Sequence, residues 1–107
     1  MTWTIEFSQE VERWLDSLST AGRAEAYLAL EQLEEHGNLL RMPWSRPLRD
    51  KLFELRFDCE DRNVRITYTF NPERRIITLT QFHKQRNNEQ RELIRARRAL
   101  KRRQSEH

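Results

Sequence analysis

The chain has 107 residues, of which 36% are hydrophobic and 35% are charged. Soluble domains average roughly 45–50% apolar and about 25% charged residues, so the sequence predicts one domain over residues 1–107 with a small core. No apolar run approaches the roughly 18 residues of a membrane span, and acidic side chains occupy the N-terminal segment, where a signal peptide is apolar. We therefore expect a cytoplasmic protein that does not enter the membrane.

The net charge of +3 is unevenly distributed along the chain. Residues 1–36 contain eight acidic and two basic side chains, whereas residues 84–103 contain nine basic and two acidic ones. Such asymmetry is typical of a surface that faces a polyanion. A solvated basic helix that binds nothing is the simpler alternative.

The N-terminal third predicts a strand followed by two helices. Residues 3–7 alternate between polar and apolar side chains, as in a half-buried strand, and Ser8 suits the N-cap of a helix. Two amphipathic helices then flank a break at residues 19–22, and we expect them to form an antiparallel hairpin. Their inward faces are Val11, Trp14, Leu15 and Leu18 in the first helix, and Ala26, Tyr27, Leu30 and Leu33 in the second.

The middle of the chain predicts a loop and then a sheet. Residues 38–51 contain two prolines and no clean periodicity, so they predict an ordered loop with Trp44 packed over the core. Three strand-like runs follow at residues 52–57, 64–70 and 76–82, and their short connections predict an antiparallel meander.

The last helix is expected to begin near Asn88 and to direct Leu93, Ala96 and Leu100, with Ile94 beside them, toward the sheet or a neighbour. The fold class is therefore α+β. We expect a small, mostly antiparallel sheet in the order β-α-α-β-β-β-α, with the helical hairpin packed on one face.

Strand alternation places two arginines on the face opposite the core. Because side chains point alternately to the two faces of a strand, Arg56 and Arg65 are expected on the same open face of two paired strands. Lys84 has the outward parity of the third strand and His83 the inward parity. A bulge, or a strand end after Phe82, would reverse these last two.

The sequence gives no sign of a metal site or a cofactor. The histidines lie far apart, and the single Cys59, in a charged stretch, is interpreted as an incidental loop residue. Gly22 and Gly37 are too few for a glycine-rich phosphate-binding loop. His36 is expected to end a helix and His107 to lie at a frayed terminus, so neither is assigned to catalysis.

The order of these elements, with "PLRDKLFELRF", "VRITYTF" and the ending "FHKQRNNEQRELIRARRAL", resembles the RelE/ParE superfamily of toxins from bacterial type II toxin–antitoxin systems. Within it, the chain looks most like the HigB-like, phage-related branch. The resemblance covers nearly the whole chain and implies a microbial RNase-type fold. RelE and HigB members cleave ribosome-bound mRNA, whereas ParE-like members inhibit DNA gyrase. The implied partner is a cognate antitoxin, often with a helix-turn-helix DNA-binding domain.

The resemblance implies a catalytic site formed by Arg56, Arg65 and Lys84, and more loosely by Lys51. Arg56 and Arg65 are expected to clamp the phosphate and Lys84 to stabilise the leaving group, because guanidinium and ammonium groups neutralise developing charge. His83 is a candidate proton shuttle. The C-terminal tail "KRRQSEH" lacks the tyrosine that RelE-like enzymes often place there, so the general acid and base stay unassigned.

These features predict a metal-independent, ribosome-dependent mRNA endoribonuclease that blocks translation. A ParE-like gyrase inhibitor without catalysis and an inactive module that only binds RNA or its antitoxin are the alternatives. Simple cross-strand ion pairing is the alternative role for Arg56 and Arg65. The residues expected to bind RNA or the ribosome are Lys51, Arg86, Arg91, Arg95, Arg98, Lys101 and Arg102.

Overall fold

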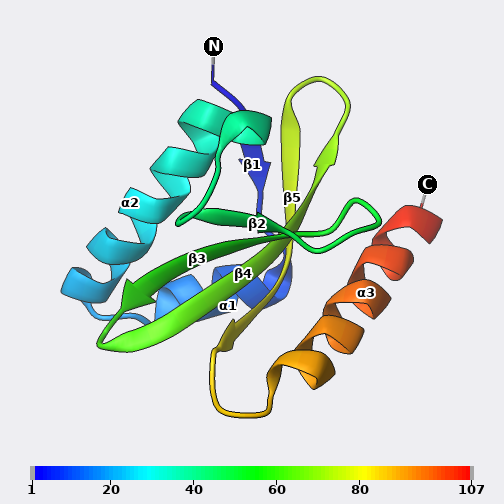
Figure 1. The fold of residues 1–107 in the computed structure, drawn as a ribbon. Helices are drawn as coiled ribbons and strands as arrows, with labels where there is room; N and C mark the ends of the chain where they lie inside the picture. Colours follow the sequence, from blue (N-terminus) through cyan, green and yellow to red (C-terminus); the bar gives the residue numbers. More distant parts are fainter. Residues whose placement is uncertain (1, 107) are drawn as a thin grey trace.

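A computed structural model describes residues 2–106, which form a five-stranded sheet and three α-helices (Figure 1). In chain order the elements are β1 (Thr4–Glu6), α1 (Gln9–Ser17), α2 (Thr20–His36), the short 3-10 helix η1 (Gly37–Leu39), β2 (Ser45–Pro47), β3 (Phe53–Cys59), β4 (Arg62–Asn71), β5 (Arg75–His83) and α3 (Glu89–Ser105). His107 lies outside the described residues.

The strand order is β1-β5-β4-β3-β2, in which β1 pairs with β5 in parallel and the other pairs are antiparallel. This confirms the predicted α+β class and the mostly antiparallel sheet. Within residues 2–106, no helix combines the length and the hydrophobicity that crossing a membrane requires.

Serine residues cap both helices of the N-terminal hairpin. Ser8 precedes α1, as predicted, and its Oγ accepts a hydrogen bond from the N–H of Val11 at 3.3 Å. Ser19 precedes α2 and its Oγ accepts from a first-turn N–H at 3.0 Å. Each hydroxyl satisfies a backbone donor that has no partner within the helix. Only Leu18 and Ser19 separate the helices, so the break is shorter than predicted.

The larger hydrophobic core lies between the sheet and the hairpin, with α1 packed against β5 and α2 against β3. In α2 the buried side chains of this core are Ala26, Ala29, Leu30 and Leu33. Tyr27 is 48% exposed, so its predicted place in the core is wrong. Tyr27 follows Ala26 by one residue, about 100° around the helix, and this rotation takes it off the buried stripe.

A smaller core lies on the opposite face of the sheet, under α3. Ile77 and Leu79 of β5 pack there with Ala96 and Leu100, while Ile76 belongs to the larger core. Both faces of β5 are therefore covered. Figure 1 shows α3 on the other side of the strands from α2, so the face predicted to be open is covered over part of its length.

The segment predicted to be a loop contains short regular structure. Gly37–Leu39 form η1, and Ser45–Pro47 form β2, an edge strand that pairs with the start of β3. A strand of three residues is too short for its alternation to be recognised. Trp44 is half-buried against the larger core, as predicted. Cys59 is buried at the end of β3, which corrects its interpretation as a loop residue.

A substitution at Gly37 tests the junction between α2 and η1. Its φ is +50°, and a Cβ at this position would lie 2.0 Å from Nε1 of Trp3. We expect Gly37→Ala to lower the free energy of unfolding by at least about 2 kcal/mol, because it adds both left-handed backbone strain and a clash with a rigid ring. Urea denaturation measures the change.

Gly22→Ala is the matched control, because its Cβ would meet only the flexible side chain of Glu60. That side chain can move aside, so the loss should be clearly smaller. Equal losses for the two variants would show that the position of Trp3 does not constrain Gly37.

Candidate active site

The register of β3 and β4 brings the two predicted phosphate-binding arginines together. Arg56 and Arg65 are direct cross-strand partners, so their side chains leave the same face, as predicted. Both Nε atoms point to Oε1 of Glu54, at 3.9 Å for Arg56 and 3.5 Å for Arg65. The face is not open at this point, because Arg65 is only 5% exposed and Glu54 only 1%.

Glu54 is a candidate functional residue that sequence reasoning missed. Its two carboxylate oxygens are buried and accept no hydrogen bond from residues 2–106. Burial raises the pKa of Glu54, although Arg65 and Arg56 act to lower it. Burial likewise lowers the pKa of Arg65 against the effect of Glu54. A carboxyl group whose pKa is raised in the midst of cations is a candidate acid–base group. The sequence could have indicated Glu54 by its position, because it lies two residues before Arg56 and therefore on the same face of the strand.

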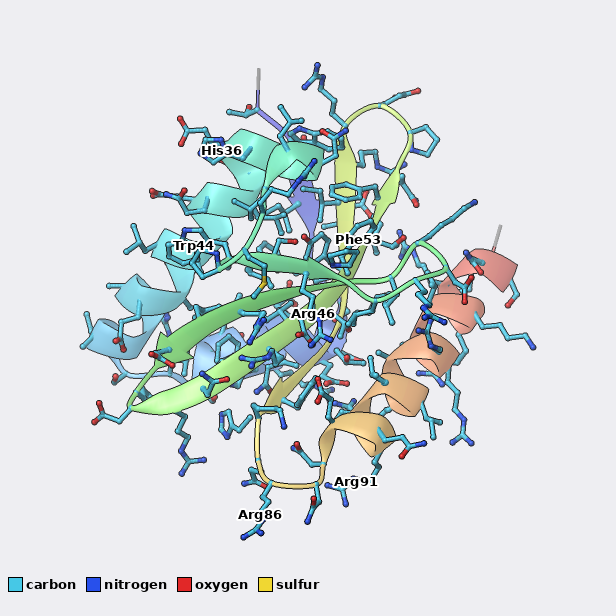
Figure 2. The ribbon with its side chains drawn as sticks, in the orientation of Figure 1. His36, Trp44, Arg46, Phe53, Arg86 and Arg91 are labelled. Atoms are coloured by element: carbon cyan, nitrogen blue, oxygen red, sulfur yellow. The ribbon has the colours of Figure 1, made fainter. Side chains whose placement is uncertain are left out.

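Further charges approach this pair from neighbouring elements. Arg46 of β2 is the cross-strand partner of Glu54. Lys84 follows β5, and its backbone N–H donates to the carbonyl oxygen of Asn63 at 2.7 Å. Glu89, the first residue of α3, lies 3.6 Å from Nη1 of Arg46 and 3.8 Å from Nζ of Lys84. Figure 2 shows Arg46 in front of the sheet, between β2 and α3. Sequence reasoning missed Arg46 because β2 was not recognised as a strand.

A β-bulge between β4 and β5 decides which side chains reach the cluster. The register shifts between Ile66 and Tyr68, so the parity of β5 changes once along its length. As a result, Ile77 and Phe82 lie on the same face although they are five positions apart. Lys84, two residues beyond Phe82, returns to the face of the arginines.

His83 does not join the cluster. In the β4–β5 register it lies opposite Val64, whose side chain belongs to the larger core, so it has the opposite parity to Arg65. Its Nδ1 lies 3.0 Å from Nη1 of Arg62. Burial, and then the charge of Arg62, lowers the pKa of His83. These contacts do not support the predicted role of His83 as a proton shuttle at the phosphate.

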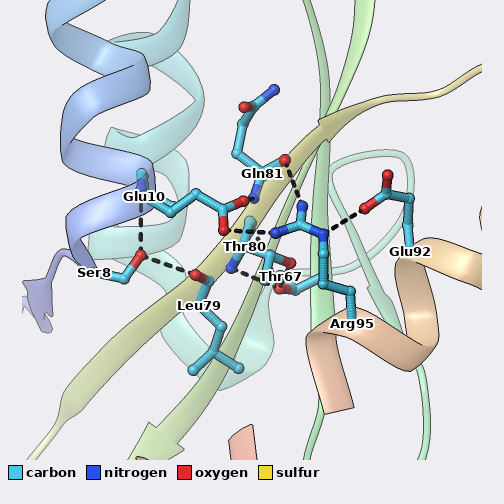
Figure 3. Close-up of polar contacts among 9 residues, drawn as sticks. Ser8, Glu10, Thr67, Leu79, Thr80, Gln81, Glu92 and Arg95 are labelled. Carbon is cyan, nitrogen blue, oxygen red and sulfur yellow. Dashed lines mark hydrogen bonds and ion pairs between the residues drawn. The ribbon is translucent and has the colours of Figure 1, made fainter. Parts of the chain in front are cut away.

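Arg95, expected to bind RNA, is engaged within the protein (Figure 3). Its Nη1 donates to Glu10 at 2.6 Å, its Nε to Glu92 at 2.9 Å and its Nη2 to the carbonyl oxygen of Gln81 at 3.0 Å. Glu10 also accepts from the N–H of Gln81 at 2.8 Å. The hydrogen bond with Glu10 raises the pKa of Arg95. Arg95 thus joins α1, β5 and α3, which corrects its assignment to the RNA surface.

The other cations expected to bind RNA are exposed. Those on the outward side of α3 are Arg91, Arg98, Lys101 and Arg102. Ile94 lies among them at 47% exposure, so of the two expected partners, the sheet or a neighbour, it does not pack against the sheet. Figure 2 shows Arg86 in the turn before α3 and Arg91 in the first turn of α3, both directed away from the sheet. Lys51 is exposed in the tight turn between β2 and β3, where its φ is 69°.

No metal site is evident among residues 2–106, because no three His, Cys, Asp or Glu side chains gather there in a suitable group.

The sequence matches one known family over most of its length. The sequence profile of the phage derived protein Gp49-like family (DUF891) matches residues 13–103. The chain belongs to this Gp49-like family. Among curated proteins, none matches the sequence.

The Gp49-like chain is similar in fold to solved RelE proteins. A mutant of the toxin RelE from E. coli in the free state gives a TM-score of 0.63, with 14% identity over 95% of this chain and 98% of that chain. The archaeal RelE–RelB complex from Pyrococcus horikoshii OT3 gives 0.58, with 20% identity over 80% and 99%. At these identities the likeness concerns the fold, and it confirms the predicted RelE-like fold. The HigB-like branch stays a prediction.

Replacement of both members of the buried pair should not destabilise the fold, whereas replacement of one member should. We expect the double variant Glu54→Met/Arg65→Met to be as stable as the wild type or more stable, by up to about 1–4 kcal/mol, because methionine avoids the cost of burying two charges. Glu54→Met alone should lose roughly 3 kcal/mol, because Arg65 then stays buried without its partner. Urea denaturation at pH 7 measures all three proteins.

The pH dependence of stability provides an independent readout of the same pair. Because burial raises the pKa of Glu54, the folded protein binds this proton more tightly than the unfolded chain. Wild-type stability should therefore decline as the pH rises from the usual value of 4.5 through the raised pKa. The double variant should lack this part of the decline; an unchanged pH profile would contradict the assignment to Glu54.

Proposed function

We propose that this Gp49-like protein is the toxin of a type II toxin–antitoxin pair and that it cleaves mRNA on the ribosome. The observation that carries the proposal is the buried carboxyl group of Glu54 between Arg56 and Arg65, with Lys84 at the edge of the same cluster. RNA cleavage through the 2′-OH needs a group that accepts a proton and cations that hold the phosphate. The RelE-like fold supports the same activity.

In the proposed mechanism Glu54 is the general base. Its carboxylate takes the proton of the 2′-OH, and the resulting oxygen attacks the neighbouring phosphorus. Arg56 and Arg65 bind the non-bridging oxygens, because the guanidinium fork matches a phosphate and neutralises its growing charge. Lys84 stabilises the 5′ oxygen as its bond to phosphorus breaks. Solvent protonates this oxygen, which leaves a 2′,3′-cyclic phosphate and a 5′-hydroxyl end.

Arg56 is the movable member of this site. Its side chain is 26% exposed, and its Nη1 contacts Sδ of Met42 at 3.2 Å. Arg65 is held more firmly, because its Nη1 donates to Oδ1 of Asn63 and to the carbonyl oxygen of Val64. An RNA phosphate that binds Arg56 draws this side chain away from Glu54. The carboxyl group then becomes accessible to the 2′-OH.

The proposed partners are the ribosome and a cognate antitoxin. The exposed cations of α3 attract ribosomal RNA by long-range electrostatics. A cognate antitoxin is the expected inhibitor, since the archaeal RelE of similar fold was solved as a complex with RelB. A helix-turn-helix domain in that antitoxin stays an expectation. A ribosomal target also requires the cytoplasmic location predicted from the sequence.

Addition of the purified protein to an in vitro translation reaction tests the proposed function. Cleaved mRNA that appears only when ribosomes are present supports it. Unaffected translation together with inhibited supercoiling by gyrase would instead indicate a ParE-like inhibitor. If neither activity is affected, the protein is a binding module.

Glu54→Gln tests the general base. We expect single-turnover cleavage on programmed ribosomes to fall by roughly 10²-fold or more, with little change in ribosome binding. The wild-type rate should fall as the pH drops through the raised pKa of Glu54, because only the carboxylate accepts a proton. Asp58→Asn is the control, because Asp58 is an exposed carboxylate on the same strand. Equal rates for Glu54→Gln and Asp58→Asn would exclude Glu54 as the base.

Substitutions of Lys84 and of the basic residues of α3 should affect different steps, cleavage in the first case and ribosome binding in the second. Lys84→Ala should lower single-turnover cleavage by about 10²-fold while ribosome binding is nearly retained, because its role is in the transition state. Replacement of Arg98, Lys101 and Arg102 together by alanine should weaken binding and its salt dependence, because fewer phosphates are neutralised. Cleavage of mRNA on ribosomes that are already saturated should persist. Full cleavage by Lys84→Ala would limit Lys84 to docking.

A further inference from the structure

The carboxylate of Glu89 lies between two cations of the candidate active site. Its Oε1 is 3.6 Å from Nη1 of Arg46, and its Oε2 is 3.8 Å from Nζ of Lys84. The three residues come from different elements: β2, the end of β5 and the start of α3. An anion held by an arginine and a lysine is the arrangement that proteins use for phosphate groups.

The space around these residues is large enough for a nucleotide phosphate. Arg46, Lys84 and Glu89 line a cavity of about 690 Å³, together with Leu48, Asn87, Gln90 and Leu93. The three side chains are partly exposed, at 51% for Arg46, 31% for Lys84 and 40% for Glu89. A dissolved anion can therefore reach both cations without unfolding any element.

This cavity continues the row of phosphate-binding side chains on the sheet. Arg46 of β2 is the cross-strand partner of Glu54 in β3, and Arg56 lies two residues beyond Glu54 in β3, on the same face. Diagonal neighbours on adjacent strands lie about 7–8 Å apart, so Arg46 lies one step from the proposed phosphate clamp. A step of this size is comparable with the repeat of an extended nucleic-acid backbone. An RNA strand whose scissile phosphate binds Arg56 can thus bring its next phosphate to Arg46.

The contacts of Glu89 are weak enough to be displaced. Both are ion pairs longer than a hydrogen bond, and all three groups are partly solvated, so water and salt screen them. A phosphate carries more acceptor oxygens than a carboxylate and can bind the guanidinium fork in two places. An RNA phosphate should therefore displace the Glu89 carboxylate from Arg46 and Lys84.

We infer that Arg46 binds the RNA phosphate next to the scissile one, and that Glu89 occupies this subsite in the free protein as an internal competitor. Displacement of Glu89 also frees Lys84 to face the leaving 5′ oxygen. The inference rests on the proposed function for the identity of the anion. Its geometry is tested by binding alone, without any cleavage.

The test measures binding of a fluorescent 2′-O-methyl RNA oligonucleotide, which lacks the attacking hydroxyl, by anisotropy at low and physiological salt. Glu89→Gln should tighten binding about fivefold at low salt, because the competitor loses its charge. Glu92→Gln is the matched control: it removes the same charge from the same first turn of α3, but its partner Arg95 lies outside the subsite. It should change affinity by less than about twofold.

A double-mutant cycle distinguishes local competition from a general charge effect. Arg46→Ala should weaken binding, and Glu89→Gln should then bring little further gain in that background. The inference is overturned if Glu89→Gln tightens binding equally in both backgrounds, or no more than Glu92→Gln. Because the oligonucleotide cannot be cleaved, coupling between positions 46 and 89 establishes the subsite even if the translation reaction shows no RNase activity. Urea denaturation of each variant confirms that it is folded.

Discussion

The buried charges of Glu54 and Arg65 impose the constraint on which the rest of the structure depends. Burial opposes ionisation of both groups, because it raises the pKa of the carboxyl and lowers that of the guanidinium. A pair of this kind contributes little to stability, since the cost of removing two charges from water rivals their attraction. It persists only because β3 and β4 are held in register by the large core on their other face. The larger core and the proposed site thus occupy opposite faces of the same two strands.

The helices cover the two faces of the sheet unequally. The hairpin of α1 and α2 covers the apolar face and supplies the larger core. The helix α3 covers only β5 and the adjoining turn on the other face, through the smaller core. On the central strands, Glu54 and Arg65 are nearly fully buried, and the neighbouring cavity is lined by Arg46, Lys84 and Glu89 from other segments. The position of α3 also brings Glu89 over Arg46 and Lys84, so the same helix limits access to the site.

The basic side chains of α3 fall into two groups with different roles. Arg95 and Arg103 bind the acidic residues Glu10 and Glu6, and Arg97 donates to the carbonyl oxygen of Leu48. These inward cations attach the helix to the rest of the domain. The outward group is exposed to solvent, so the same helix both stabilises the fold and contributes to the positive potential of the surface.

Sequence alone determined the α+β class, the N-cap of α1, most of the buried faces of the helices, and the shared face of Arg56 and Arg65. Each of these follows from local periodicity, which side-chain direction in a helix or strand obeys. Tertiary structure alone decided the burial of Glu54 and the ion-pair partners of Arg46, Glu89 and Arg95. Alternation along β3 puts Glu54 on the face of Arg56, but burial depends on what lies above a residue, and β2 was too short to be recognised. The charges of α3 are alike in sequence, and only the contacts with Glu10 and Gln81 separate Arg95 from its exposed neighbours. Local spacing fixes the direction of a side chain, whereas its partners and its desolvation depend on segments distant in sequence.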